Sequence, residues 1–308
     1  MSSTRPVVLV LLVCLALLLL PSSALALTLD QRVAALEAHS ATQDAKIASL
    51  EASVTALRAR VASLETTAVM KLNKYVSVNT GTINGLAGPH IIFTGANVHI
   101  RSGSGATNGV ANGRGNLIVG YDETLTGAVR TGSHNLVVGP YHTFSSHGSL
   151  VAGYHNAAKA SYTSITGGRE NTATAGYAAI SGGYRNSAAG SYSSVTGGQG
   201  NTASGDYGSV SGGESNTALG DHSSVSGGEV GIASGQLSSV SGGVSNTASG
   251  QSSSVSGGEV STASGFASSV SGGSDGTASG DDSSVSGGDT RSAIGTQDWV
   301  AGALFQDF

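Results

Sequence analysis

The sequence predicts an all-β parallel solenoid, or β-roll, of 15-residue coils that follows an N-terminal α-helical coiled-coil stalk. The first observation behind this prediction is one branched apolar residue that recurs every fifteen positions. Its members are Leu150, Ile165, Ile180, Val195, Val210, Val225, Val240, Val255, Val270, Val285 and Val300. An alanine stands eight residues after each of the first ten, from Ala158 to Ala293. Repeats this short are not separate domains, so each is expected to be one coil that buries its apolar side by stacking on its neighbours.

A single coil is expected to contain two short strands joined by glycine-rich corners. In one unit the strands are residues 194–196 and 202–204, with Val195 and Ala203 pointing inward and their Ser and Thr neighbours pointing outward. The Gly-Gly pair after each valine is expected to turn one corner. Asparagines recur at the other corner, where a stacked ladder would satisfy the hydrogen bonds of the turn. Its members are Asn156, Asn171, Asn186, Asn201, Asn216 and Asn246, and it lapses at Gly231, Ser261, Gly276 and Arg291.

A heptad pattern over residues 27–72 predicts a parallel coiled coil. The a positions are Val33, Ser40, Ile47, Val54, Val61 and Ala68, and the d positions are Leu29, Leu36, Gln43, Leu50, Leu57 and Leu64. Opposite charges at g and the next e favour parallel helices in register, as in Arg32 with Glu37 and Lys46 with Glu51. β-Branched a residues with leucine at d favour two helices in the bundle. The heptad pattern alone does not decide between a dimer and a trimer. The alternative is one long amphipathic helix lying on its own domain.

The remaining segments complete a five-part organisation. Residues 1–26 have the charged start, apolar run and small-residue cleavage site of a secretory signal peptide, which contains the only cysteine, Cys14. Residues 27–72 form the coiled coil, 73–149 a junction with irregular coils, 150–295 the regular solenoid and 296–308 a C-terminal cap. The cap is expected to consist of Trp299, Leu304, Phe305 and Phe308. A mature chain without cysteine would have no disulfides and no cysteine metal site. The apolar run is too short for a good membrane anchor, so the mature chain is expected to have no membrane span and to be secreted, extracellular or at the cell surface.

The junction carries apolar runs that predict the first strands of the solenoid. Residues 75–78 alternate as a strand does, and 79–89 are typical of a loop. His90–Phe93 and Val98–Ile100 are expected to be the first strands of the solenoid. Three further runs, 117–120, 136–139 and 150–153, end in glycine and are expected to be coils with longer corners. The surplus residues become surface loops, where recognition is common.

Composition and charge exclude several classes of function. Eleven acidic residues against Arg291 alone follow position 195, which disfavours nucleic acid and anionic membranes as partners. They are Asp206, Glu214, Asp221, Glu229, Glu259, Asp275, Asp281, Asp282, Asp289, Asp298 and Asp307.

Four histidines lie close together in the sequence, His134, His142, His147 and His155, but without the spacing of a metal-binding helix. No serine nucleophile elbow is present, and 272–276 fails the calcium β-roll pattern. We therefore predict a protein that is not an enzyme, with no catalytic residue, metal or cofactor.

The coil repeat resembles the head repeat of trimeric autotransporter adhesins of the YadA type. The likeness rests on Ser194-Val195-Thr196-Gly197-Gly198 and Asn201-Thr202-Ala203-Ser204-Gly205, and it covers residues 98–295. It implies a left-handed β-roll, a homotrimer and attachment to a surface. Two departures are a stalk that precedes the head and the lack of the family's C-terminal membrane anchor, so simple secretion is also expected.

Three functions follow from these patterns. The first is a secreted or cell-surface, trimeric, fibrous binding or adhesion protein, whose exposed corners (184–185, 206–207 and 221–222) are where a ligand would touch. The second is an ice-binding solenoid, because the outward Thr-x-Ser columns resemble those of plant inhibitors of ice recrystallisation, although Leu219, Ile232 and Ser292 interrupt them. The third is a purely structural surface fibre. The sequence identifies no ligand-binding residue and no ligand.

Overall fold

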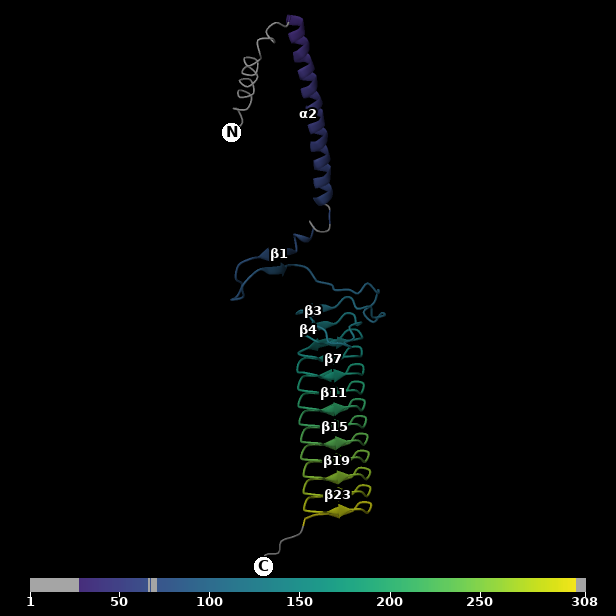
Figure 1. Ribbon diagram of the computed structural model, residues 1–308. Helices are drawn as coiled ribbons and strands as arrows, with labels where there is room; N and C mark the ends of the chain where they lie inside the picture. Colours follow the sequence, from purple (N-terminus) through teal and green to yellow (C-terminus); the bar gives the residue numbers. More distant parts are fainter. Residues whose placement is uncertain (1–27, 66, 68–70, 303–308) are drawn as a thin grey trace, which may run out of the picture. The chain divides into compact units, whose positions relative to one another are not determined.

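The computed structural model describes residues 28–65, 67 and 71–302, which divide into two compact units at Val98 and His99 (Figure 1). The first unit holds a helix and a β-hairpin, and the second holds a parallel β-solenoid. The predicted signal peptide and the cap residues Leu304, Phe305 and Phe308 lie outside the described residues. No described helix is both long enough and apolar enough to cross a membrane.

The predicted heptad segment forms a single helix, α2 (Leu29–Glu65), of 37 residues. It begins with a capping box, in which the Thr28 hydroxyl accepts from the Gln31 N–H (3.4 Å) and the Gln31 side chain accepts from the Thr28 N–H (3.0 Å). At 1.5 Å per residue the helix is about 55 Å long. It has no buried residue, so its apolar positions are open within the first unit.

The junction forms a hairpin rather than solenoid coils. Strand β1 (Val76–Asn79) pairs antiparallel with β2 (His90–Phe93), and the loop between them contains a tight turn at Asn84 and Gly85, both with positive φ. The strand expected at 75–78 is therefore confirmed. The assignment of His90–Phe93 to the solenoid was wrong, because its backbone partners lie on β1, and residues 98–100 form no strand.

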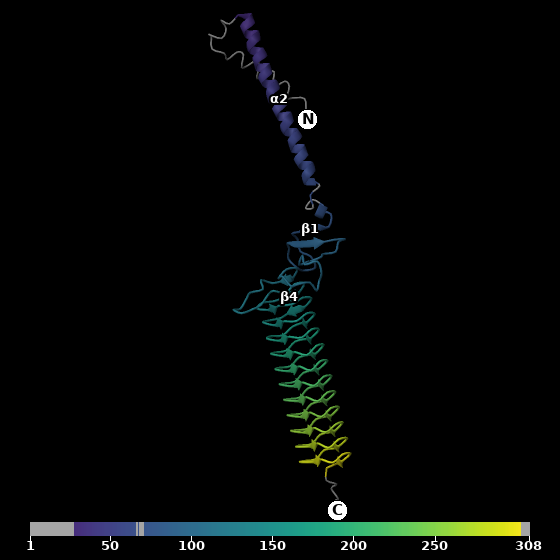
Figure 2. The same ribbon diagram turned by 90° about the vertical axis from the view of Figure 1, so that its right-hand side faces the viewer.

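The second unit stacks its coils along one axis, with two parallel sheets on either side of the core (Figures 1 and 2). The 13-stranded sheet comprises β3 (Leu117–Val119), β4 (Leu136–Val138), β6 (Leu150–Ala152), β8 (Ser164–Ile165), β10 (Ala179–Ile180), β12 (Ser194–Val195), β14 (Ser209–Val210), β16 (Ser224–Val225), β18 (Ser239–Val240), β20 (Ser254–Val255), β22 (Ser269–Val270), β24 (Ser284–Val285) and β26 (Trp299–Val300). The 11-stranded sheet comprises β5 (Thr143–Phe144), β7 (Ala157–Ala158), β9 (Thr172–Ala173), β11 (Ser187–Ala188), β13 (Thr202–Ala203), β15 (Thr217–Ala218), β17 (Ile232–Ala233), β19 (Thr247–Ala248), β21 (Thr262–Ala263), β23 (Thr277–Ala278) and β25 (Ser292–Ala293). The predicted parallel solenoid of 15-residue coils is confirmed.

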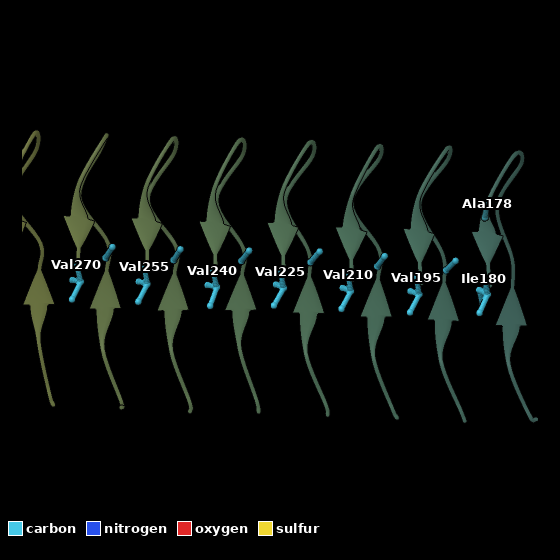
Figure 3. Packing of buried hydrophobic residues seen from close by; sticks show 14 of the residues in the cluster. Ala178, Ile180, Val195, Val210, Val225, Val240, Val255 and Val270 are labelled. Carbon is cyan, nitrogen blue, oxygen red and sulfur yellow. The ribbon is translucent and has the colours of Figure 1, made fainter. Parts of the chain in front are cut away.

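The core is one column of valines or isoleucines facing one column of alanines (Figure 3). Each member is at most 1% exposed, from Ile165 to Ala293. The expected start of the valine column at Leu150 was wrong. Leu150 pairs with the outward Ser164, whereas its neighbour Val151 pairs with Ile165 and is fully buried. The coil before Ile165 is one residue shorter, and a one-residue change turns every side chain of a strand to the other face.

The asparagine ladder is confirmed as a column of buried side chains that is unbroken from Asn156 to Asn216. Each asparagine oxygen accepts from the backbone N–H of the next coil, as Asn186 does from Asn201 (2.9 Å). Its amide nitrogen donates to two glycine carbonyls, for example from Asn201 to Gly197 and Gly213 (2.9 Å each). At two of the four positions where the asparagine is missing, Gly231 and Ser261, the backbone N–H still donates to the asparagine of the preceding coil. These bonds provide hydrogen-bond partners for backbone N–H and C=O groups that are buried beside the thin apolar core.

A column of buried hydroxyls completes the interior, and the sequence pattern does not predict it. Ser253 and Ser268 donate to the carbonyls three residues before them, at 2.7 and 2.8 Å. Among the described residues, Ser193, Ser223, Ser238 and Ser283 occupy the same column without a hydrogen-bond partner for the hydroxyl. Ala178 already stands in this column and is fully buried. The hydroxyl is therefore dispensable at this position in the coil.

Replacing one of the unpartnered serines is expected to stabilise the solenoid. Ser238→Ala removes a buried hydroxyl without breaking a hydrogen bond, so the free energy of unfolding should rise by about 1 kcal/mol. Ser253→Ala is the matched control, since it removes a bonded hydroxyl and should lower the same quantity by about 1 kcal/mol. Urea unfolding followed by circular dichroism measures both. Equal destabilisation by the two variants would contradict the conclusion that the Ser238 hydroxyl has no partner whereas the Ser253 hydroxyl is hydrogen-bonded.

Candidate binding surfaces

The two sheets present flat outer faces that differ in regularity. On the 11-stranded sheet the outward Thr-x-Ser columns are interrupted, as the sequence indicated, by Leu219 and Ile232, and Leu219 is 54% exposed. On the 13-stranded sheet the outward residues on either side of each core valine are all Ser or Thr over seven consecutive coils. They run from Ser194 and Thr196 to Ser284 and Ser286. The uninterrupted hydroxyl face therefore lies on the sheet that sequence reasoning did not single out.

One corner of the solenoid carries a ladder of aromatic rings. Tyr162, Tyr177, Tyr192, Tyr207 and His222 occupy equivalent positions, each with a positive φ near 60°. Their rings stack with centroids 4.7–5.2 Å apart and interplanar angles of 0–17°. Because each ring covers the faces of its neighbours, mainly the ring edges and phenol hydroxyls face solvent. The predicted contact points 206–207 and 221–222 lie on this ladder, but 184–185 does not.

The other corner carries a cluster of arginine and tyrosine, with a carboxylate between the two guanidinium groups. Arg169 lies between the rings of Tyr154 and Tyr184, 5.4 and 5.6 Å from their centroids, and Arg185 lies 4.8 Å from the second ring. Glu170 bonds Nε of Arg185 (2.7 Å) and Nε of Arg169 (2.8 Å). These bonds, first to Arg185 and then to Arg169, hold the pKa of Glu170 below its ordinary value. Exposed arginine and tyrosine are the residue types enriched at binding hot spots.

Charge is distributed unevenly along the solenoid axis because sequence order is also axial order. The arginine–tyrosine cluster belongs to the first coils. From Ser191 to Gly302 the chain carries ten carboxylates and one guanidinium. Four of these acids, Glu214, Glu229, Glu259 and Asp289, continue the column of Arg169 and Tyr184. The corner that is cationic and aromatic in the first coils is thus acidic in the last ones.

The four clustered histidines are separated by the fold and take different roles. His134 accepts from the backbone of Ser102 (3.0 Å), and the ring of His147 meets Tyr162 edge to face. His155 turns a corner with a φ of 53°. His142 is fully buried. Among the described residues, no three histidine, cysteine or acidic side chains lie close enough together to hold a metal ion.

His142 takes the place of an asparagine in the buried ladder. Its Nδ1 accepts from the Asn156 N–H (3.1 Å), and its Nε2 donates to the Val138 carbonyl (3.0 Å), just as Asn156 donates to Ala152. Both bonds require the neutral ring with its proton on Nε2. Burial holds the pKa of His142 below its ordinary value. The nearby Asp122 has a raised pKa, first because of its own burial and despite the Arg130 guanidinium.

Acid is expected to destabilise the solenoid through His142. In the folded chain this ring stays neutral at a pH where the unfolded chain already binds a proton. The free energy of unfolding should therefore fall as pH drops below about 6.5 and level off below the folded pKa. Asp122 acts with the opposite sign at lower pH, because its raised pKa favours the protonated folded form. His142→Asn keeps the ladder and should remove the first of these two effects. Unfolding midpoints from pH 8 to pH 4 for both proteins measure the difference, and parallel curves would contradict it.

The heptad seam of α2 is an exposed apolar surface. Its nine large a and d side chains are all 45–74% exposed. They are Leu29, Val33, Leu36, Ile47, Leu50, Val54, Leu57, Val61 and Leu64. Shallow hollows lie along the seam, one lined by Ile47, Leu50 and Val54 and the next by Val54, Leu57 and Val61. Such hollows receive side chains of a facing helix in coiled coils.

Trp299 is the one residue named in the predicted cap that lies among the described residues. Trp299 lies in β26, paired with Ser284 in the outward column, and its indole N–H donates to the Ser286 hydroxyl (2.8 Å). It is 66% exposed. The tryptophan therefore extends a sheet face by one more strand.

Comparison with protein-family models and with curated proteins finds no match for this chain.

Proposed function

We propose that this protein is a secreted or cell-surface, homotrimeric, fibrous binding or adhesion protein without catalytic activity. In it, α2 forms a parallel three-stranded coiled coil, and left-handed solenoids present their outer faces to a ligand. The observation that carries the proposal is the heptad seam, whose large apolar residues are at least 45% exposed along the whole helix. Exposure on this scale marks an association surface.

The charges beside the seam support parallel association. Arg32, Lys46 and Arg60 stand at g positions, and Glu37, Glu51 and Glu65 at the following e positions. In a parallel, in-register bundle each g residue faces the next e residue of a neighbouring helix. The choice of three chains rests on the likeness of the coil repeat to trimeric adhesin heads, since the seam alone favours two. The arginine–tyrosine cluster is the surface of the solenoid best suited to contact a ligand.

The test is the mass and location of the protein made by its own cells or by an expression host. Light scattering after gel filtration should give three times the mass of the single mature chain, in the culture medium or on the cell surface. A monomer at micromolar concentration would overturn the assembly. Retention inside the cell would overturn the location. A trimer that adheres to no cell or matrix surface would overturn the binding function, and a purely structural fibre would then be the remaining function.

Ice binding is the second candidate function, and the uninterrupted hydroxyl face of the 13-stranded sheet favours it. Two straight columns of Ser and Thr over seven coils repeat at the strand spacing of about 4.8 Å. Inhibition of ice recrystallisation by the intact protein, lost on Ser239→Tyr in the middle of this face, would support the candidate. Equal recrystallisation with and without the protein would eliminate it.

A further inference from the structure

We infer that the β1–β2 hairpin is a second subunit interface, in which its apolar face packs against the same hairpin of neighbouring copies. The inference rests on the proposed parallel assembly and extends it beyond α2. The hairpin register places Val76 opposite Phe93 and Val78 opposite Ile91. Directly opposed residues point to the same side of a β-ribbon, so these four apolar side chains share one face.

The other face of the hairpin is different in chemistry. Ser77 lies opposite Ile92 and Asn79 lies opposite His90, so three of its four side chains are polar. On the apolar face, Val78 is 67% exposed, Ile91 69% and Phe93 53%. The ribbon thus has an apolar side and a polar side, and three of the four side chains on the apolar side are exposed. This pattern is typical of a strand pair that packs on something through one face.

A two-stranded hairpin with no cover is at best marginally stable in water. Outside the four-pair ladder of β1 and β2, the hairpin is held by one bond from the Thr94 N–H to the Tyr75 carbonyl and by the turn at Ile83 and Leu86. The hairpin therefore needs a surface that buries Val78, Ile91 and Phe93. The exposed apolar side chains continue on both sides of it, with Leu72 51% and Val98 59% exposed.

The heptad seam indicates what covers the apolar face of the hairpin, which is the same hairpin of a second copy. Only ten residues separate the end of α2 at Glu65 from the start of β1 at Val76, which is a reach of at most about 35 Å. If the seam joins copies in parallel and in register, the hairpins of all copies are each held within that reach of the same end of the bundle. The g-to-e charge pairs fix that register, which makes a second copy of this hairpin the surface present at the highest local concentration.

The experiment compares single cysteines placed in a Cys14→Ser background, which leaves no other thiol in the chain. Val78→Cys reports the apolar face, and the adjacent Ser77→Cys is the matched control on the polar face. Val54→Cys reports the α2 seam. Mild oxidation should join Val78→Cys chains into disulfide-linked pairs and leave Ser77→Cys chains single. Maleimide labelling of the Val78→Cys variant should be slow in the oligomer and at least about tenfold faster after dilution to single chains.

The outcomes separate this interface from the proposed function. Cross-linking at position 54 with rapid labelling at position 78 would overturn the hairpin interface and keep the coiled coil. Protection of position 78 that persists on dilution would also overturn it, because the chain's own residues would then cover the face. Failure of cross-linking at both positions would overturn the parallel assembly itself. Cross-linking at 54 and 78 but not at 77 is the result expected.

Discussion

Gly228→Ala is expected to unfold the coils around it, lowering the free energy of unfolding by about 3 kcal/mol or more. Gly228 has a φ of +91°, which costs a residue with a Cβ about 1–2 kcal/mol. A Cβ at this position would also run into the backbone carbonyl of Gly243 in the next coil. The inter-coil bond from Glu229 to the Gly243 carbonyl (2.9 Å) would then lengthen or break. Thermal and urea unfolding followed by circular dichroism measure the loss.

The adjacent glycine provides the matched control. A Cβ on Gly227 meets no atom within 4 Å, and its φ lies outside the left-handed region. Gly227→Ala should therefore leave stability unchanged or raise it by up to about 1 kcal/mol, because it restricts the unfolded chain. The two substitutions are chemically identical and one residue apart. Similar midpoints for both variants would show that the coil corner does not have the geometry described here.

Val54→Asp is expected to dissociate the assembly into single chains. Val54 is an a residue at the centre of the seam, and it lines both hollows of that surface. An aspartate there would place like charges from every copy in one buried layer, weakening association by at least about 4 kcal/mol, or about 1,000-fold. Light scattering after gel filtration at micromolar concentration should give the mass of one chain instead of three.

Ala52→Asp controls for the cost of aspartate in a helix. Ala52 stands at an f position, on the side of α2 away from the seam. The substitution lowers helix propensity by about 0.7 kcal/mol, which is more than Val54→Asp does, but it should leave the oligomeric mass unchanged. Dissociation by both variants would mean that helix stability, and not a seam contact, controls the assembly. An oligomer that survives Val54→Asp would remove α2 from the interface.

The solenoid was predictable because its 15-residue period is visible in the amino-acid sequence. Val195 and Ala203 repeat at equal spacing over many coils, and parallel pairing in register is the arrangement that stacks equal side chains. The asparagine ladder was predictable for the same reason. Prediction failed where the period changes. One residue fewer before Ile165 moved Leu150 outward and Val151 inward, which apolar character alone does not distinguish.

The corners were harder to predict than the strands. The Gly-Gly motif suggests that both residues turn the chain, but in most coils only the second has a positive φ. Many of the other left-handed positions hold residues that carry no signal for this conformation, such as tyrosine, leucine and even Val230. The inter-coil bonds impose it, as when the Val230 N–H donates to the Glu214 carbonyl (2.9 Å). The ring ladder of Tyr162 to Tyr207 follows from those turns.

The amino-acid sequence by itself determined the two architectures, a heptad helix and a solenoid of 15-residue coils, because each is a local period that recurs many times. Only the tertiary structure decided where the irregular residues go. It placed His90–Phe93 against β1, put His142 into the asparagine ladder, and moved the uninterrupted hydroxyl face to the 13-stranded sheet. The physical reason is that these positions are fixed by partners distant in the chain, to which no repeat in the sequence refers.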